Sequence, residues 1–159
     1  MACVFQNVAE KKQRRKENAG FMEYRTHFAL WCLFGVPLMM GCDLRTVNET
    51  SKALIAIDQD EECRPPYLAG KSGEDPYFFI RHLSNNEFVL AYFNLSEAGH
   101  EYRCSASFAD LGIPYESGCG LELTDVFTGE NPGVKRDYFL PAIEPHSCRM
   151  YKAKRVKIK

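Results

Sequence analysis

The chain has 159 residues, 45% of them hydrophobic and 13% aromatic, which is enough to bury the core of one ordinary domain. It carries 20 basic and 21 acidic side chains, a formal net charge of -1, so no global field favours nucleic acid or an anionic membrane as a partner. No apolar run reaches the roughly 20 residues that a membrane-spanning helix needs. We therefore expect a soluble, globular protein.

The N-terminus favours a cytoplasmic location. Its short apolar patch precedes the basic run Lys11–Lys16, which reverses the charge order of a secretory signal. The basic run itself is typical of a solvated helix face, although it could also bind phosphate groups. The seven cysteines are an odd number without the spacing of a disulfide framework, so we predict reduced thiols in buried, apolar roles.

The first predicted element is a helix over Val4–Leu33, or two helices that break near Ala19–Gly20. Tyr24, Phe28 and Trp31 follow helical spacing and form one apolar face. The other faces of this segment are apolar too. Such a helix is expected to be covered on several sides.

The next predicted elements are a buried strand over Val36–Met40 and a helix over Leu44–Leu54. This helix–strand–helix order is the repeating unit of a barrel or a parallel sheet, in which strand ends carry ligand chemistry. Gly41, Cys42 and Asp43 are therefore candidate residues of a substrate-pocket rim. The alternative for Asp43 is a structural helix N-cap.

After Asp60 the pattern changes to short strands separated by turns, which predicts an antiparallel β-sandwich of the Greek-key type. The segment Phe88–Phe93 is apolar on both faces and should lie centrally, and Ser84–Glu87 is the strongest hairpin signal. A strand is also predicted at Tyr67–Gly70. The remaining predicted strands are Tyr77–Leu83, Glu87–Leu95, His100–Phe108, Leu121–Phe127, Tyr138–Ile143 and Ser147–Lys152.

No metal or other cofactor is expected. The acidic cluster of Asp58, Asp60, Glu61 and Glu62 lacks the ligand pattern of a calcium loop and is predicted to be a solvated linker. The histidines and cysteines lack zinc-site spacing; the histidines are His27, His82, His100 and His146. Three tyrosines could stack on a sugar ring or simply pack at edges; these are Tyr67, Tyr77 and Tyr115.

Four segments carry a specific resemblance. Glu23–Arg45, with the word Pro-Leu-Met-Met-Gly-Cys-Asp-Leu-Arg at its end, and Ile55–Asp60 resemble the α-galactosidases (melibiases) of glycoside hydrolase family 27, clan D. Asp125–Glu130 and Pro145–Tyr151 resemble the closing strands of that family. The resemblance implies that residues 1–60 are the truncated C-terminal end of a (β/α)8 barrel and that residues 65–159 are the C-terminal β-sandwich domain.

The resemblance also implies a family activity, the retaining hydrolysis of terminal α-galactosides. That mechanism needs two carboxylates about 5 Å apart, which the family places in the words Lys-Tyr-Asp and Asp-Asp-X-Trp, and neither word occurs here. We therefore expect a C-terminal fragment that is inactive alone, with no assignable catalytic residue. Its expected partners are a carbohydrate in the complete enzyme, and either a second copy or the missing barrel half.

Two alternatives stay open at this stage. One is a non-catalytic β-sandwich that supports a barrel or binds carbohydrate. The other is an orphaned gene fragment with no activity of its own.

Overall fold

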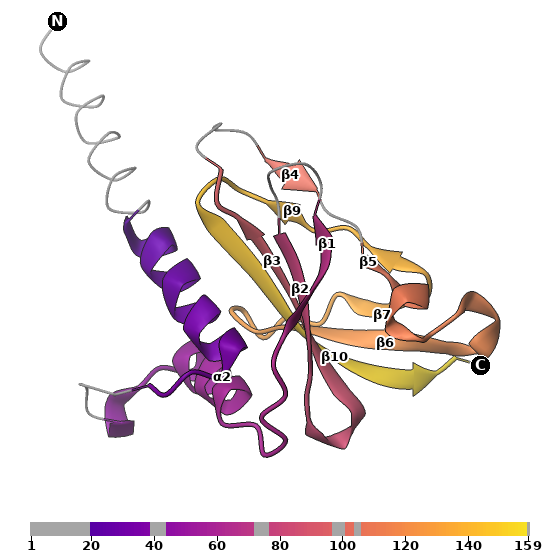
Figure 1. The fold of residues 1–159 in the computed structure, drawn as a ribbon, viewed down its shortest axis with the longest axis horizontal. Helices are drawn as coiled ribbons and strands as arrows, with labels where there is room; N and C mark the ends of the chain where they lie inside the picture. The colour runs from indigo at the N-terminus through magenta and orange to yellow at the C-terminus, as the bar shows by residue number, and fades with distance from the viewer. Residues whose placement is uncertain (1–19, 39–43, 72–76, 97–100, 104–105, 159) are drawn as a thin grey trace, which may run out of the picture.

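The computed structural model describes residues 20–38, 44–71, 77–96, 101–103 and 106–158. A small helical part packs against a larger antiparallel β part (Figure 1). The helical elements are a helix over residues 20–34, the 3-10 helix η1 (Leu44–Thr46) and the α-helix α2 (Glu49–Asp58). The strands and remaining 3-10 helices are β1 (Tyr67–Lys71), β2 (Tyr77–His82), η2 (Ser84–Asn86), β3 (Glu87–Asn94), β4 (Tyr102–Arg103), β5 (Ala106–Ser107), η3 (Phe108–Leu111), η4 (Tyr115–Ser117), β6 (Cys119–Asp125), β7 (Gly133–Lys135), β8 (Tyr138–Phe139), β9 (Ala142–Ile143) and β10 (Ser147–Lys157).

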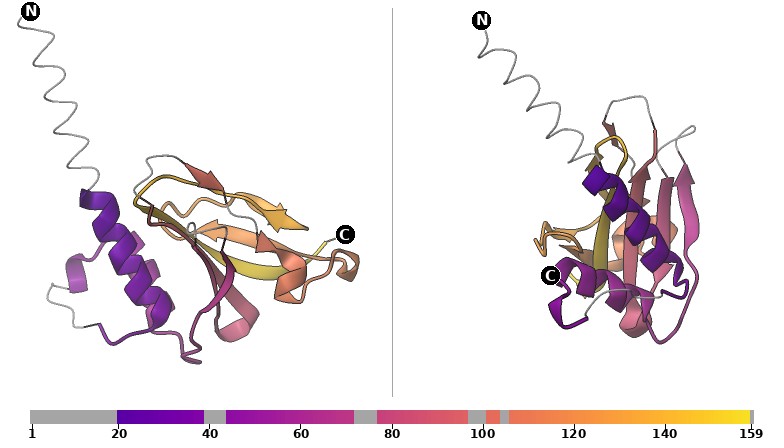
Figure 2. Two further views of the ribbon diagram at one scale, coloured as in Figure 1. Left: turned by 45° about the horizontal axis from the view of Figure 1, so that its top comes forward. Right: turned by 90° about the vertical axis from the view of Figure 1, so that its left-hand side faces the viewer.

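The β part has two layers. The main sheet has six antiparallel strands in the order β1-β2-β3-β10-β6-β7, so the last strand of the chain lies between β3 and β6. Two small antiparallel pairs, β4 with β9 and β5 with β8, lie over one face of that sheet (Figure 2). The predicted antiparallel sandwich is confirmed.

Strand β3 contributes to two hydrophobic cores because both of its faces are covered. Every residue of β3 after Glu87 is buried, as the two-sided apolar pattern predicted. Leu90 and Tyr92 pack between the two layers with Phe108 and Leu123. The opposite face packs under the helices; its residues include Val89, Ala91, Phe93 and Met150 of the sheet and Ala29, Leu33, Leu54 and Ile57 of the helices.

The hairpin between β2 and β3 is formed as predicted. Asn85 and Asn86 adopt φ values of 59° and 56°, in the left-handed region that asparagine tolerates better than most residues. The main-chain N–H of Leu83 donates to the carbonyl oxygen of Glu87 at 2.9 Å and closes the turn.

The predicted strands of the second layer are too long. The segment predicted at His100–Phe108 contains β4 and β5, and Phe108 begins η3. The segment predicted at Tyr138–Ile143 is divided into β8 and β9 around Pro141, which has no N–H to donate to a strand partner.

Three strands of the main sheet also differ from the prediction. Strand β6 begins at Cys119 and ends at Asp125, two residues earlier at each end, because a turn begins after Asp125. Strand β7 lies where only a turn was predicted, and β10 continues to Lys157. Strand β1 is confirmed and extends to Lys71.

The helical part departs further from expectation. The predicted helix over Val4–Leu33 is confirmed for its described residues, and residues 4–19 lie outside the described ranges. The strand predicted at Val36–Met40 is wrong for Val36–Leu38, which are irregular, because no described strand lies beside them to pair. Within the described part of the chain, no helix is long and apolar enough to cross a membrane.

The helix predicted at Leu44–Leu54 begins later than expected. η1 occupies its first residues, and α2 starts at Glu49 with Asn48 as its N-cap, whose side chain accepts a hydrogen bond from the N–H of Ser51 at 2.8 Å. The start predicted after Asp43 is therefore wrong, and Asp43 itself lies outside the described residues.

Candidate functional site

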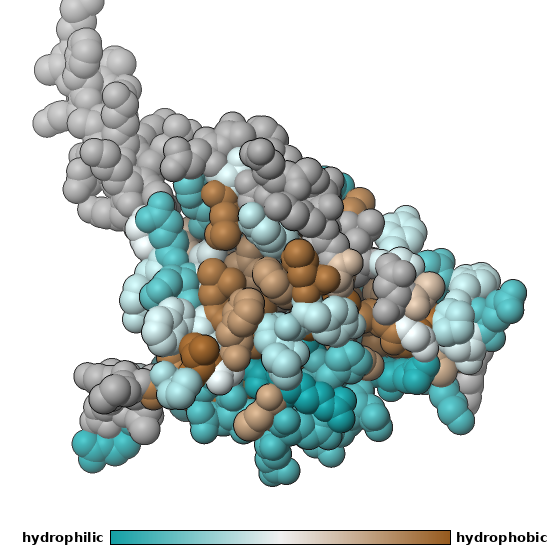
Figure 3. All heavy atoms as spheres, in the orientation of Figure 1, coloured by the Kyte–Doolittle hydropathy of each residue, from teal (hydrophilic) through white to brown (hydrophobic). Residues whose placement is uncertain are grey.

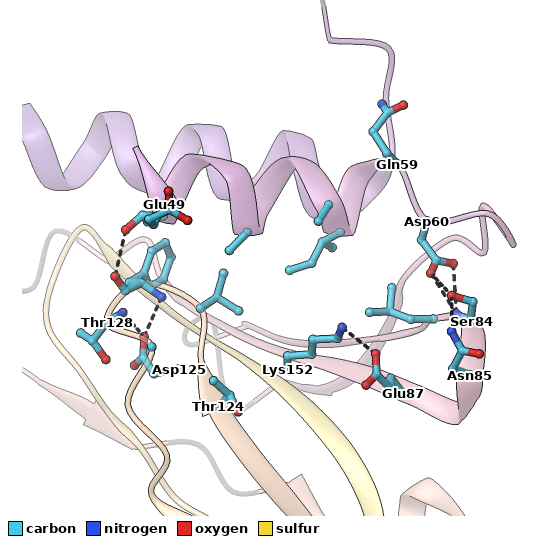
Figure 4. A pocket seen from close by; sticks show the side chains of 18 of the residues that line it. Glu49, Gln59, Asp60, Ser84, Asn85, Glu87, Thr124, Asp125, Thr128 and Lys152 are labelled. Atoms are coloured by element: carbon cyan, nitrogen blue, oxygen red, sulfur yellow. Dashed lines mark hydrogen bonds and ion pairs between the residues drawn. The ribbon is translucent and has the colours of Figure 1, made fainter. Parts of the chain in front are cut away.

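A groove of about 700 Å³ lies between α2 and the main sheet (Figure 4). Helix α2 contributes Glu49, Ala53 and Ile57 to its lining, and the sheet and its turns contribute Glu87, Asp125 and Lys152. Grooves at the junction of two structural units are common ligand sites, so the chemistry of these side chains decides what this one can do.

The helices are fixed over the sheet at the turn that follows β6. The hydroxyl of Thr50 donates to the carbonyl oxygen of Phe127 at 3.0 Å, and the guanidinium of Arg25 lies 4.4 Å from the centre of the Phe127 ring. Leu54 and Ile57 are almost fully buried beneath α2. Both helices therefore contact the same turn, and this turn forms one end of the groove.

Asp60 connects the end of the helical part to the β2–β3 hairpin. Its carboxylate accepts hydrogen bonds from the Ser84 N–H at 2.9 Å, the Ser84 hydroxyl at 2.7 Å and the Glu62 N–H at 3.2 Å. Burial opposes the charged form, but these hydrogen bonds and the charge of Arg81 outweigh it and lower the pKa of Asp60. Asp60 is held as a carboxylate.

Two other acidic side chains of the groove are engaged in structural contacts. Asp125 accepts from the N–H groups of Phe127 at 2.8 Å and Thr128 at 3.0 Å, which shapes the turn after β6. Glu87 pairs with the ammonium of Lys152 at 2.6 Å across the sheet.

These contacts suit a structural junction better than a hydrolytic centre. A retaining glycosidase uses one carboxylate as nucleophile and a second, with a raised pKa, as acid. In this groove the pKa of Asp60 is lowered, and Asp125 and Glu87 each accept donors from the protein itself. Of these three carboxylates, Asp60 links the helical part to the hairpin, and the contacts of Asp125 and Glu87 lie within the sheet and its turn.

The residues predicted to rim a substrate pocket, Gly41, Cys42 and Asp43, lie outside the described residues. The predicted solvated linker is wrong for two of its members. Asp58 is buried as the last residue of α2 and Asp60 is buried where it contacts Ser84 of the hairpin, while Glu61 and Glu62 are exposed.

The tyrosines considered for sugar stacking do not gather at one site. Tyr67 stacks on His82, with 5.9 Å between ring centroids, and Tyr77 stacks on Phe79 at 6.4 Å. Tyr67 and Tyr77 lie at opposite ends of the β1–β2 pair. Tyr115 is 68% exposed and lies in a separate shallow pocket with Glu116 and Arg136.

Two cysteines have the buried role that was predicted for them. Cys32 and Cys148 are fully buried, and burial raises the pKa of Cys32 to about 12 and that of Cys148 to about 11. Cys63 is exposed, contrary to that prediction. Among the described side chains, no group of three or more His, Cys, Asp or Glu is arranged to hold a metal ion.

Sequence reasoning missed the residue that joins the two parts most directly. Arg81 is 1% exposed, and its Nη1 donates to the carbonyl oxygens of Cys32 at 2.8 Å and Leu33 at 3.1 Å, at the C-terminus of helix 20–34. Gly35 follows with φ +60°, and a Cβ atom there would lie 3.1 Å from Nη2 of Arg81. A basic residue in the middle of the apolar strand Tyr77–His82 is the signal that could have identified it.

The fold and the groove define a class: an antiparallel β-sandwich domain that carries helices on one face of its main sheet. Comparison with known families gives a match for residues 73–153 to the alpha galactosidase C-terminal beta sandwich domain. The chain belongs to this family.

The similar curated proteins are glycosidases. The α-galactosidase of Cyamopsis tetragonoloba is 28% identical over 135 residues, which cover 81% of this chain and 32% of that protein. The α-N-acetylgalactosaminidase of Gallus gallus is 31% identical over 143 residues, which cover 82% of this chain and 34% of that protein. The chain thus spans about a third of the length of these relatives.

Solved structures share the fold. Alpha-galactosidase I from Mortierella vinacea matches with a TM-score of 0.67 and 22% identity, over 83% of this chain and 35% of that one. A GH27 β-L-arabinopyranosidase from Geobacillus stearothermophilus matches with a TM-score of 0.66 and 21% identity, over 84% of this chain and 30% of that one. Proteins named for different sugars therefore share this part of the fold.

Proposed function

We propose that the chain is the non-catalytic C-terminal part of an α-galactosidase-type glycoside hydrolase and does not cleave glycosides by itself. In this proposal residues 1–60 are the end of a (β/α)8 barrel and residues 65–159 are the β-sandwich that supports it. The substrate of the complete enzyme is a carbohydrate such as a terminal α-galactoside.

The hydrogen bonds and the ion pair made by the acidic side chains of the groove support this proposal. Asp60 joins the end of the helical part to the hairpin, Asp125 shapes the turn that Thr50 of α2 contacts, and Glu87 pairs with Lys152 within the sheet, so each of these carboxylates has a structural contact. The sequence also lacks both words in which the family places its catalytic carboxylates. A junction built in this way supports a role in holding a barrel on a sandwich.

Two further parts of the proposal concern partner and location. The proposed partner is the missing half of the barrel or a second copy of the chain. The location is the cytoplasm, which is consistent with the free thiols of the four described cysteines; these are Cys32, Cys63, Cys119 and Cys148.

Carbohydrate binding without turnover is the second candidate function. The exposed ring of Tyr115, beside the polar side chains of Glu116 and Arg136, has the combination of an apolar face and hydrogen-bonding groups that binds sugars. Loss of galactose binding in Tyr115→Ala, with no loss in Tyr138→Ala, would favour this candidate; Tyr138 is also exposed, at 62%.

The test of the main proposal is hydrolysis of a chromogenic α-galactoside by the purified full chain. We expect no release above the buffer rate. An enzyme-like rate that co-purifies with the chain, and that changes in Asp43→Asn or Asp60→Asn, would overturn the proposal. A rate that separates from the chain on a second chromatographic step would identify a contaminating hydrolase.

A further inference from the structure

A pocket of about 540 Å³ lies between the two layers of the sandwich, where β6 ends. Its lining comes from the end of β6, the turn that follows it, the start of β9 and the first half of β10. Its volume is within the range of small-molecule sites, so the polar groups that it presents decide what it can bind.

Three polar side chains project from the main sheet toward this pocket. Alternate residues of a strand share a face, and Leu123 of β6 and Ala153 of β10 belong to the core between the layers. Asp125, Arg149 and Tyr151 therefore lie on the same side of the sheet as that core. Asp125 is directly opposite Tyr151 in the β6–β10 register, so a carboxylate, a guanidinium and a phenol meet here.

Each of these side chains keeps unused hydrogen-bonding capacity. Asp125 accepts the N–H groups of the following turn through Oδ1 alone, and no described residue donates to its Oδ2. The hydroxyl of Tyr151 and the guanidinium of Arg149 have no hydrogen bond or ion pair within the described part of the chain. Asp125 is 6% and Tyr151 8% exposed, yet neither Oδ2 nor the phenol oxygen is fully enclosed, so a small ligand can reach both.

The protein holds these groups in place. The turn after β6 fixes the carboxylate of Asp125, and the ring of Tyr151 lies edge-on to Phe139 with 4.8 Å between their centroids. Burial raises the pKa of Tyr151, and the charge of Asp125 raises it further while that of Arg149 lowers it. The phenol therefore stays protonated at neutral pH and can donate a hydrogen bond.

The charges of the lining select a neutral ligand. Asp125 and Glu130 are acidic and Arg149 is basic, so the lining has one net negative charge, which opposes an anion, while the guanidinium opposes a metal cation. A molecule with adjacent hydroxyl groups can use all three polar side chains, because one hydroxyl donates to Oδ2 of Asp125 and its neighbour accepts from Arg149. Pro141 supplies an apolar wall for C–H groups.

We propose that this pocket binds a neutral pyranose sugar through Asp125, Arg149 and Tyr151. The inference goes beyond the proposed function, because it concerns a pocket separate from that of Tyr115 and requires no hydrolysis. Failure of sugar binding here would leave the expected lack of hydrolysis untouched.

The first test is a titration of the full chain, followed by two-dimensional NMR of its backbone amides. The probes are methyl β-D-galactopyranoside, methyl β-D-glucopyranoside and inorganic phosphate. At least one glycoside should cause saturable shifts in the millimolar range for amides of residues 125–132 and 141–151. No shift there with either glycoside, or shifts there with phosphate alone, would overturn the proposal.

Self-association would give a different pattern in the same spectra. Brown, apolar side chains gather from the helical part toward β1 and β2 (Figure 3). Contact between copies through that area would move the amide signals of the helices, β1 and β2, and it would depend on protein concentration rather than on glycoside. Shifts confined to those elements would count against the proposed pocket.

The second test removes single polar groups. Tyr151→Phe keeps the ring and loses only the hydroxyl, and it should weaken glycoside binding about fivefold. Arg149→Gln loses a charged donor and should weaken it about tenfold or more. Tyr115→Ala, in the separate pocket, is the control and should leave the affinity unchanged.

The outcomes of the substitutions are distinct. If Tyr151→Phe or Arg149→Gln binds as tightly as the unsubstituted chain, or if Tyr115→Ala abolishes binding, the ligand lies elsewhere and the proposal is overturned. Far-UV circular dichroism verifies that each variant is folded, and Tyr151→Phe decides the question if Arg149→Gln does not fold.

Discussion

Arg81 shows how a single buried charge can join two parts of a chain. The last carbonyl groups of a helix have no partners within the helix, and Nη1 of Arg81 supplies donors to two of them, those of Cys32 and Leu33. The chain must then leave the helix close to the guanidinium. Gly35 makes this exit with a left-handed φ of +60° and no Cβ.

Gly35→Ala is therefore expected to be more costly than an ordinary substitution of a left-handed glycine. The conformation alone costs about 1 kcal/mol, and the new Cβ would press on Arg81, so we expect a loss of about 2–3 kcal/mol in unfolding free energy. Urea denaturation followed by circular dichroism measures it. Gly112→Ala is the matched control, since Gly112 has φ +69° but open space around it, and should lose only about 1 kcal/mol. Equal losses in both variants would show that Arg81 adds nothing.

Asp60 leads to a pH-dependent prediction. The pKa of Asp60 is lower in the folded chain than in the unfolded chain, so its contribution is present above the unfolded value of about 3.9 and is lost as pH falls through the folded value. Asp60→Asn should destabilise the chain by about 1 kcal/mol at pH 7. The difference from the unsubstituted chain should shrink steadily below about pH 4.

Thermal unfolding at pH 7, 5 and 3 tests this dependence. Glu61→Gln, an exposed neighbour of Asp60, serves as the control and should show no comparable change. A deficit of Asp60→Asn that is the same at all three pH values would contradict the role of the carboxylate charge.

Helix α2 illustrates how a local signal can be placed at the wrong residue. Both Asp43 and Asn48 are good N-cap residues, and only the structure shows that Asn48 performs this role. Asn48→Ala should cost about 1 kcal/mol, and Asn48→Asp should cost much less, because aspartate also caps helices well. Equilibrium unfolding in urea distinguishes them, and equal losses would argue against capping.

The elements that the sequence predicted well are those with long, regular patterns. Strand β3 is apolar at successive positions because both of its faces are covered, and the two asparagines of the hairpin have an intrinsic tolerance of positive φ. The strands of the second layer have two residues each, which is too short for any periodicity. Their existence depends on tertiary packing.

The candidate site was less accessible to sequence reasoning. The groove depends on Asp60 meeting Ser84, a contact between residues 24 positions apart, and on Thr50 meeting Phe127 across 77 positions. No local pattern encodes such pairs. The strand predicted at Val36–Met40 fails for its described part because a strand needs neighbours, and the described sheet offers none there.

At the scale of the whole molecule, the main sheet is a layer between two different cores. One core lies within the sandwich and includes Leu90 and Leu123. The other lies between the sheet and the helices, and there Ala91, Phe93 and Met150 are fully buried. The sandwich therefore has an apolar outer face that the helical part covers. We therefore expect the β part to fold without the helical part but to be less soluble without it.

A chain of residues 65–159 should fold and yet associate. The core between the two β layers stays intact, so far-UV circular dichroism should keep its β signal and a cooperative thermal transition. Loss of the helices exposes the face of Ala91, Phe93 and Met150, so the shortened chain should bind the dye ANS and form oligomers in sedimentation velocity.

Ala91→Lys in the shortened chain, on the exposed face and away from the inner core, should restore a monomer and reduce ANS binding, because a charge interrupts the patch. If the shortened chain is unfolded, the helical part is required for the sandwich core. If it is monomeric without the lysine, the outer face does not drive self-association.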